Sequence, residues 1–207
     1  MNILITGAKI GLGKYLAQHY KEKNNVAICS RTMKSEIRSL HFLTSKCDIR
    51  DIKEINHFLR TIKNYFQHID VLINNAGIIK FDLIKDIKIK DLNNIIDTNL
   101  KGTILFTQAF LNADLKPKYI INIGSIRAIT SAPHKTVYSA SKFGLRAFTQ
   151  SLNIEFPNIK STLLCPGTFD LNNHKAIKMK DILKTLEYIF SLSDNAKIPE
   201  IVIGGQL

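Results

Sequence analysis

Short runs of β-branched and other apolar residues alternate along this chain with segments in which apolar residues recur every three or four positions. The first pattern is typical of strands buried on both faces, and the second of helices that cover a sheet. Their alternation predicts βαβ units, and therefore a parallel sheet with helices on both faces. The candidate strands are residues 2–6, 26–30, 41–45, 70–73, 118–124, 160–165 and 200–203.

The clearest helical pattern follows the third candidate strand. Its apolar positions recur at spacings of three and four and are Ile52, Ile55, Leu59, Ile62 and Phe66. Asp51 and Glu54 at the start of this segment form a candidate capping box. No internal repeat, low-complexity stretch or linker interrupts the chain, so we expect one domain over residues 1–207.

The composition fits an ordinary globular protein, with 207 residues, 45% of them hydrophobic and 22% charged. No apolar run reaches the length of a membrane span, and the first residues read as a strand that leaves no room for a signal peptide. Cys29, Cys47 and Cys165 lack the number and spacing of a disulfide framework or a zinc site. We therefore expect a cytoplasmic protein without a metal site or a membrane partner.

The net charge of +12 raises the alternative of nucleic-acid binding, because basic surfaces gain affinity by releasing counterions from phosphates. The distribution of charge argues against it. Lysines outnumber arginines about fourfold and are scattered over expected helix surfaces, with no cluster interleaved with aromatic residues. This pattern favours a solvated lysine-rich surface and no nucleic-acid partner.

The segment "ITGAKIGLGKYLAQHY" follows the first candidate strand and opens a helix, with Gly7, Gly11 and Gly13 around the turn. Residues without a Cβ allow a tight turn and a close approach of backbone N–H groups to a pyrophosphate at the positive end of the helix. The position of the turn, which includes Lys9 and Ile10, indicates a dinucleotide site. The alternative is that the glycines serve only the packing of strand against helix.

The end of the second candidate strand bears on which dinucleotide is bound. An acidic residue there would accept hydrogen bonds from the adenosine ribose of NAD, but this chain has Ser30 and Arg31. A guanidinium suits a 2'-phosphate, and Lys9 in the first turn is placed to help it. The pattern favours NADP over NAD, against the alternative of a solvated Arg31.

Seven short motifs occur in order: "TGAKIGLG", "CDI", "NNAG", "TNLKG", "IGS", "YSASK" and "PG". In this order and at these intervals the chain resembles the short-chain dehydrogenase/reductase family, from residue 2 to the final "VIGG". The resemblance implies a three-layer, doubly wound Rossmann-type sheet of about seven strands. It also implies reversible hydride transfer between a nicotinamide and a carbonyl or alcohol substrate.

The same resemblance assigns further residues to the cofactor. Asp48 and Ile49 would flank the adenine, "NNAG" would line the cofactor cleft at the end of the fourth strand, and "PG" would also contact the cofactor. Small residues in these motifs let the backbone approach the ribose closely. The implied positions are Asn75, Ala76 and Gly77 in the first motif, Pro166 and Gly167 in the second, and Thr168 directly after it.

The resemblance also identifies a catalytic set. Tyr138 and Lys142 are one helical turn apart, so they lie on one helix face and can share a ligand. Tyr138 is expected to be the general acid and base, while Lys142 favours its phenolate and holds the nicotinamide ribose. Ser125, at the end of a candidate strand, would hydrogen-bond the substrate oxygen as charge develops.

Asn99 completes this set from a different kind of pattern. It stands on an otherwise mainly apolar stripe of the expected helix 91–112, and a buried amide needs hydrogen-bond partners. The family interpretation is that Asn99 supports a water-mediated proton path to Lys142. The alternative is a structural amide that bridges backbone groups, and the two roles can coexist.

The chain departs from the family pattern after "CPG". Relatives commonly carry a threonine that binds the nicotinamide carboxamide where this chain has Leu171, with Thr168 or backbone groups as alternative donors. The stretch between Pro166 and a helix beginning near Lys178 is also short for a substrate lid. Two hypotheses follow: an open site for a bulky or carrier-bound carbonyl substrate, or a catalytically weak NAD(P)-binding sensor or scaffold.

Other features are left as alternatives. Arg127 could contact an anionic substrate or face solvent, and His134 is expected to be a loop residue. Helices 91–112 and 136–156 could form a homodimer or homotetramer interface, unless the core of the monomer consumes their apolar residues. Reduction of a 3-oxoacyl thioester is the first substrate hypothesis, with small ketones, sugars, pterins and steroids open.

Overall fold

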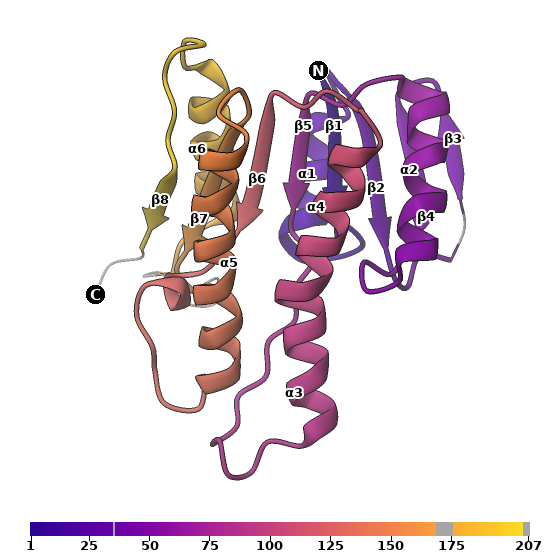
Figure 1. Cartoon of the computed structure of the whole chain (residues 1–207). Coiled ribbons are helices and arrows are strands. Elements are labelled where there is room, and N and C mark those ends of the chain that lie inside the picture. The colour runs from indigo at the N-terminus through magenta and orange to yellow at the C-terminus, as the bar shows by residue number, and fades with distance from the viewer. Residues whose placement is uncertain (35, 169–175, 205–207) are drawn as a thin grey trace.

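A computed structural model describes residues 1–34, 36–168 and 176–204, which fold around one eight-stranded sheet (Figure 1). The strand order is β3-β4-β2-β1-β5-β6-β7-β8, and all pairs are parallel except β3 with β4. The strands are β1 (Asn2–Thr6), β2 (Asn25–Ser30), β3 (Ile37–Ser39), β4 (Phe42–Lys46), β5 (Val71–Asn74), β6 (Tyr119–Ile123), β7 (Lys160–Pro166) and β8 (Glu200–Ile203).

Helices cover both faces of this sheet, as the alternating pattern predicts. They are α1 (Gly11–Tyr20), α2 (Ile52–Phe66), α3 (Ile89–Ile96), α4 (Thr103–Asn112), α5 (Thr136–Glu155) and α6 (Met179–Ser191). Figure 1 shows α2, α4 and α5 side by side in front of the sheet. The predicted three-layer, doubly wound α/β fold is confirmed.

Strand β1 shows how one sequence serves two hydrophobic cores. Ile3 and Ile5 pack in the core that includes residues of α1 and α6, whereas Leu4 packs in the core that includes residues of α2 and α4. Successive side chains of a strand point to opposite faces, so an uninterrupted apolar run supplies both layers. The described part of the chain has no helix long and apolar enough to cross a membrane.

All seven candidate strands are present, with boundaries shifted by one residue at most. The eighth strand, β3, was not predicted from the sequence. It has three residues, all exposed, and pairs only with β4 along the sheet edge, in antiparallel register. So short and exposed a strand carries no apolar pattern.

Two helical expectations need correction. The helix expected over 91–112 is divided into α3 and α4 by a π-helical segment, Asp97–Gly102. At α2, Asp51 caps the backbone N–H groups of Lys53 and Glu54 at 2.8 and 3.3 Å, as expected. The reciprocal half of the capping box is absent, because Glu54 Oε2 accepts the N–H of Asp48 at 2.8 Å instead.

The parallel strands bring the predicted motifs to one edge of the sheet. The chain leaves β1 into the glycine turn, β5 into Asn75, β6 into Ser125 and β7 into Gly167. The carboxyl ends of parallel strands are the usual place for a ligand in doubly wound folds.

Candidate active site

The glycine turn between β1 and α1 has the geometry that its residues predict. Gly7 has φ of +66°, and a Cβ there would lie 2.6 Å from the Cα of Ala76. Gly11 has φ of +59° and faces open space, with nothing within 4 Å of where a Cβ would stand. Gly13 instead packs beneath the turn against Ala8 and the carbonyl of Gly7. The turn thus leaves open space above its backbone at the start of α1.

A cavity of about 460 Å³ opens above this turn. Its wall includes residues from the ends of β1, β2, β4 and β5 that the sequence assigned to the cofactor, and also Leu12, Thr32, Cys47, Ile78 and Thr98, which it did not. The predicted residues among them are Gly7, Lys9, Ile10, Gly11, Ser30, Arg31, Asp48, Ile49, Asn75, Ala76 and Gly77.

Two polar groups in this cavity fit a bound nucleotide. Ser30 Oγ and Thr98 Oγ1 are buried and have no hydrogen-bond partner within the described ranges. Buried hydroxyls are normally satisfied, so unpaired ones in a cavity wall favour a ligand with complementary polar atoms. Together with the open face of the glycine turn, they suit a phosphate- and ribose-bearing cofactor.

Basic groups surround the end of β2. Arg31 is exposed at the cavity wall, and Lys9 Nζ donates to the carbonyl of the next residue, Thr32, at 2.7 Å. Among the described residues that line this cavity, Asp48 is the acidic one, and its carboxylate is paired with Arg50 at 2.6 Å. Hydrogen bonds from Arg50 lower the pKa of Asp48, and the charge of Arg31 adds to the effect.

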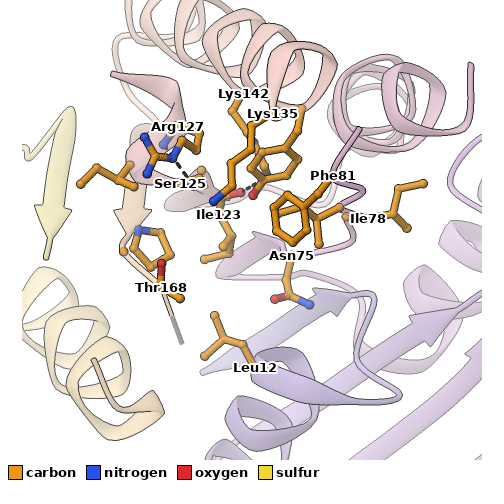
Figure 2. A pocket seen from close by; sticks show the side chains of 17 residues that line it. Leu12, Asn75, Ile78, Phe81, Ile123, Ser125, Arg127, Lys135, Lys142 and Thr168 are labelled. Carbon is orange, nitrogen blue, oxygen red and sulfur yellow. Dashed lines mark hydrogen bonds between the residues drawn. The ribbon is translucent and has the colours of Figure 1, made fainter. Parts of the chain in front are cut away.

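A second cavity, also of about 460 Å³, continues from the first (Figure 2). The two share Leu12, Asn75, Gly77 and Ile78, so they form adjoining halves of one cleft. Ser125, Tyr138 and Lys142 line the second half, as do Pro166, Gly167 and Thr168. The structure therefore brings the predicted catalytic side chains to the end of the predicted cofactor groove.

Ser125 occupies a defined position in this cavity. It precedes a short 3₁₀ turn, Ile126–Ala128, and its Oγ accepts the backbone N–H of Arg127 at 3.1 Å. Because the oxygen is fixed as an acceptor, the hydroxyl proton is available for Tyr138 or for a ligand oxygen. Burial raises the pKa of Tyr138, while the hydrogen bond with Ser125 and the charge of Arg127 act in the opposite direction.

Lys142 lies behind Tyr138 in a buried position. Its Nζ donates to the carbonyl of Ile123 at 2.8 Å and stands 5.9 Å from the centre of the Tyr138 ring. Burial lowers the pKa of Lys142 to about 8. A buried lysine with so low a pKa can lose or gain a proton near neutral pH. That Lys142 favours the Tyr138 phenolate stays a prediction.

Asn99 lies outside both cavities, within the π-helical segment, and is fully engaged. Its Oδ1 accepts the N–H of Ile78 at 2.8 Å, and its Nδ2 donates to the Ile78 carbonyl at 2.9 Å and to Ser141 Oγ at 3.1 Å. The structural role considered from the sequence is therefore present. Single π turns occur frequently at functional sites. The proton path from Asn99 to Lys142 stays a prediction.

The remaining candidate residues differ in whether they lie at the catalytic cavity. His134 is an exposed loop residue with φ of +61°, as expected, and its carbonyl accepts the N–H of Asp82 at 3.0 Å. Leu171 lies outside the described residues. Arg127 and Lys135 both line the catalytic cavity. Lys135 was not singled out from the sequence; it is the residue before α5 and lies three positions before Tyr138.

Comparison of the sequence with known proteins identifies the family. The sequence profile of the short chain dehydrogenase family matches residues 1–181. The 3-oxoacyl-[acyl-carrier-protein] reductase FabG of Haemophilus influenzae is 32% identical over 79% of this chain and 72% of its own length. FabG of Buchnera aphidicola subsp. Baizongia pistaciae is 29% identical over 90% and 80%.

Solved structures show the same fold. Serine dehydrogenase from Escherichia coli superposes with a TM-score of 0.87 at 23% identity, covering 98% of this chain and 97% of that one. The closed form of serine dehydrogenase complexed with NADP+ gives a TM-score of 0.89 at 23% identity, with coverage of 98% and 94%.

Proposed function

This chain belongs to the short chain dehydrogenase family and is an NAD(P)-dependent oxidoreductase, and from that premise we propose an NADP-dependent reductase in which Tyr138 is the general acid and base. The observation that carries the proposal is the placing of Ser125, Tyr138 and Lys142 in one cavity that adjoins the glycine turn. A bound nicotinamide would supply hydride to a carbonyl carbon or accept it from an alcohol.

The residues of the first cavity would hold this cofactor. The backbone at Gly11 leaves room for the pyrophosphate, and Asp48 and Ile49, which line the same cavity, would flank the adenine. Arg31 and Lys9 favour the 2'-phosphate of NADP, since no acid at the end of β2 is available to bind the ribose of NAD. The complex of serine dehydrogenase with NADP+ is a precedent within the same fold.

The acid–base chemistry follows from three side chains. The Tyr138 hydroxyl would donate its proton to the substrate oxygen, with Ser125 donating a second hydrogen bond to the same oxygen. Lys142 would return a proton toward Tyr138, since its pKa of about 8 allows exchange near neutral pH. A Cβ at Gly77 would lie 3.4 Å from Asn99 Oδ1 and 3.8 Å from Lys142 Nζ, so both groups border the same residue, which supports the water-linked path from Asn99.

We propose 3-oxoacyl thioesters as the first substrate class to test, because two relatives are 3-oxoacyl-[acyl-carrier-protein] reductases. Such a substrate can be carrier-linked or a small free thioester.

We also propose that the protein is a homodimer or homotetramer in the cytoplasm. Exposed apolar side chains on α4 and α5, namely Ile104, Phe143 and Ile154, support the oligomer. Three free, buried cysteines support the reducing environment of the cytoplasm. Light scattering of the purified protein tests the oligomeric state.

A fluorescence titration with NADPH and NADH tests the cofactor assignment. We expect NADPH to bind at least tenfold more tightly, because one charge-assisted hydrogen bond contributes about 1.5–3 kcal/mol. Arg31→Glu should remove most of this preference. Equal affinities in the wild type would refute the assignment to NADP, and binding of neither cofactor would refute the reductase proposal.

A panel of carbonyl substrates, assayed with the preferred cofactor, tests the chemistry. Tyr138→Phe should retain cofactor binding and lose about 10²- to 10⁴-fold in kcat, the usual contribution of a general acid. Cofactor binding without turnover of any carbonyl compound would instead favour the sensor or scaffold alternative.

A further inference from the structure

The catalytic cavity carries more positive charge than the proposed chemistry uses. Besides Lys142, its wall contains Arg127 and Lys135, and no Asp or Glu stands among its described lining residues. Arg127 lies in the 3₁₀ turn that follows Ser125, and Lys135 precedes Tyr138 by three residues; Figure 2 shows both side chains at the cavity. Both basic side chains are partly buried.

These two cations are not neutralised by carboxylates in the described part of the chain. Arg127 Nη1 donates to the carbonyl of Ser131 at 3.0 Å, a neutral partner that fixes the side chain while leaving other N–H groups free. Lys135 Nζ stands over the ring of Phe81 at 4.7 Å. An aromatic ring holds an ammonium in place without cancelling its charge.

The acidic residues nearest in sequence to Phe81 are engaged elsewhere. Asp82 pairs with Lys80 at 3.5 Å, Asp86 pairs with Lys85 at 3.9 Å, and Asp91, further along the chain, pairs with Lys80 as well. The segment that carries Phe81 is tied to the loop before α5 by the hydrogen bond from Asp82 N–H to the His134 carbonyl. The arrangement therefore keeps Lys135 at the cavity mouth without an acidic partner.

Much of the rest of this wall is apolar. Ile78, Ile79, Phe81 and Ile126 line the cavity, and Ile79 and Phe81 are 51% and 55% exposed. A ligand with an apolar body would cover these side chains and would remove water from around the two cations. Partial exclusion of water strengthens the attraction between a cation and an anionic ligand.

We propose that the substrate of this enzyme is an organic anion, whose carboxylate or phosphate binds Arg127 and Lys135 while its apolar body covers Phe81 and its carbonyl oxygen reaches Ser125 and Tyr138. This inference rests on the proposed reductase function and names the substrate class for the same cavity. The anionic group has two possible sources, a free oxo acid or the phosphate of a carrier arm.

Two matched substrate pairs test the proposal. The first is 5-oxohexanoate with its neutral methyl ester, and the second is an acetoacetyl thioester of phosphopantetheine with the neutral thioester of N-acetylcysteamine. The ratio of kcat/KM for the anionic and the neutral member of each pair is measured in the wild type, in Arg127→Gln and in Lys135→Gln. Lys180→Gln, an exposed position on α6, is the control for loss of one positive charge.

We expect the anionic member of one pair to be preferred by about tenfold to a hundredfold in the wild type, the range for one charge-assisted hydrogen bond. Each cavity variant should lower that ratio, because only one of the two cations then remains, and Lys180→Gln should leave it unchanged. A preference in the first pair identifies a free oxo acid, and a preference confined to the second identifies the carrier arm. Equal kcat/KM values within both pairs in the wild type would overturn the proposal.

A binding measurement separates this inference from the reductase proposal. Hexanoate and hexanamide, which cannot be reduced, are titrated by calorimetry into the protein loaded with NADP. Binding of hexanoate that exceeds that of hexanamide and is lost in Arg127→Gln would support the anion site, even if every carbonyl compound failed to react. Failure of hexanoate to bind better than hexanamide, in a protein that reduces neutral carbonyls, would overturn the anion site and leave the reductase intact.

Discussion

Replacing Lys142 by methionine should remove catalysis and yet change stability in a direction set by pH. In the folded chain Lys142 is buried, and burial lowers its pKa from 10.5 to about 8. A change in pKa converts to free energy at about 1.36 kcal/mol per pH unit, so keeping this lysine protonated in the folded state costs roughly 3 kcal/mol at pH 7. Methionine has a similar length and carries no charge.

The sign of the effect follows from proton linkage. Below pH 8 both the folded and the unfolded chain hold the proton, and the full cost is present. Between pH 8 and 10.5 the unfolded chain binds more protons than the folded one, so wild-type stability rises with pH. Lys142→Met lacks this dependence. It also loses the hydrogen bond to the Ile123 carbonyl, about 1 kcal/mol at every pH.

Urea unfolding of the cofactor-free protein measures both terms. At pH 7 the variant should be more stable than the wild type by about 1–2 kcal/mol, and at pH 10 this advantage should shrink by roughly 2 kcal/mol or reverse. Lys180→Met, at an exposed position on α6, should show no such change between the two pH values. A difference between Lys142→Met and wild type that is the same at pH 7 and pH 10 would refute the reasoning.

Three further substitutions test the turn, the hydroxyl and the cap. Gly7→Ala should abolish nicotinamide binding in a fluorescence titration and destabilise the fold, because φ is +66° and the new Cβ would lie 2.6 Å from Ala76; unchanged affinity would contradict the close approach. Ser125→Ala should lower kcat by about 10²- to 10³-fold with little change in cofactor affinity, and a purely structural serine would leave kcat nearly intact. Asp51→Ala should destabilise the protein by about 1 kcal/mol in urea unfolding, since its side chain accepts two N–H groups at the start of α2; no loss would mean that water replaces the cap.

The sequence predicted the central sheet well because its signal is strong. Strands such as β1 and β6 are buried along their whole length, so each consists mainly of apolar residues, with Asn122 as an exception inside β6. Strand β3 lacks that signal, since all of its residues are exposed. The π-helical segment was not predicted because the apolar residues before and after Asn99 recur at spacings close to those of an ordinary α-helix.

The site was predictable where backbone geometry restricts residue choice. Gly7 was identifiable because only a residue without a Cβ fits its turn. Lys135 and Phe81 gave no comparable signal, since their contact joins two loops that are distant in sequence. The partner of Glu54 was also not predictable from the sequence. Its spacing from Asp51 suggested a capping box, but in the fold its carboxylate accepts the N–H of Asp48 instead.

The π-helical segment means that the number of residues between α3 and α4 determines how the side chains on both sides of it are oriented. A π turn accommodates one residue more than an α turn, and each residue of an α-helix turns the chain by about 100°. Deleting a single residue from Asp97–Gly102 would permit regular α-helical hydrogen bonds, and local helix stability could even increase. It would also rotate Asn99 away from Ile78 or turn the apolar face of α4 away from the sheet. Substitutions in this helix should therefore impair the enzyme less than insertions or deletions that change the length of the helix.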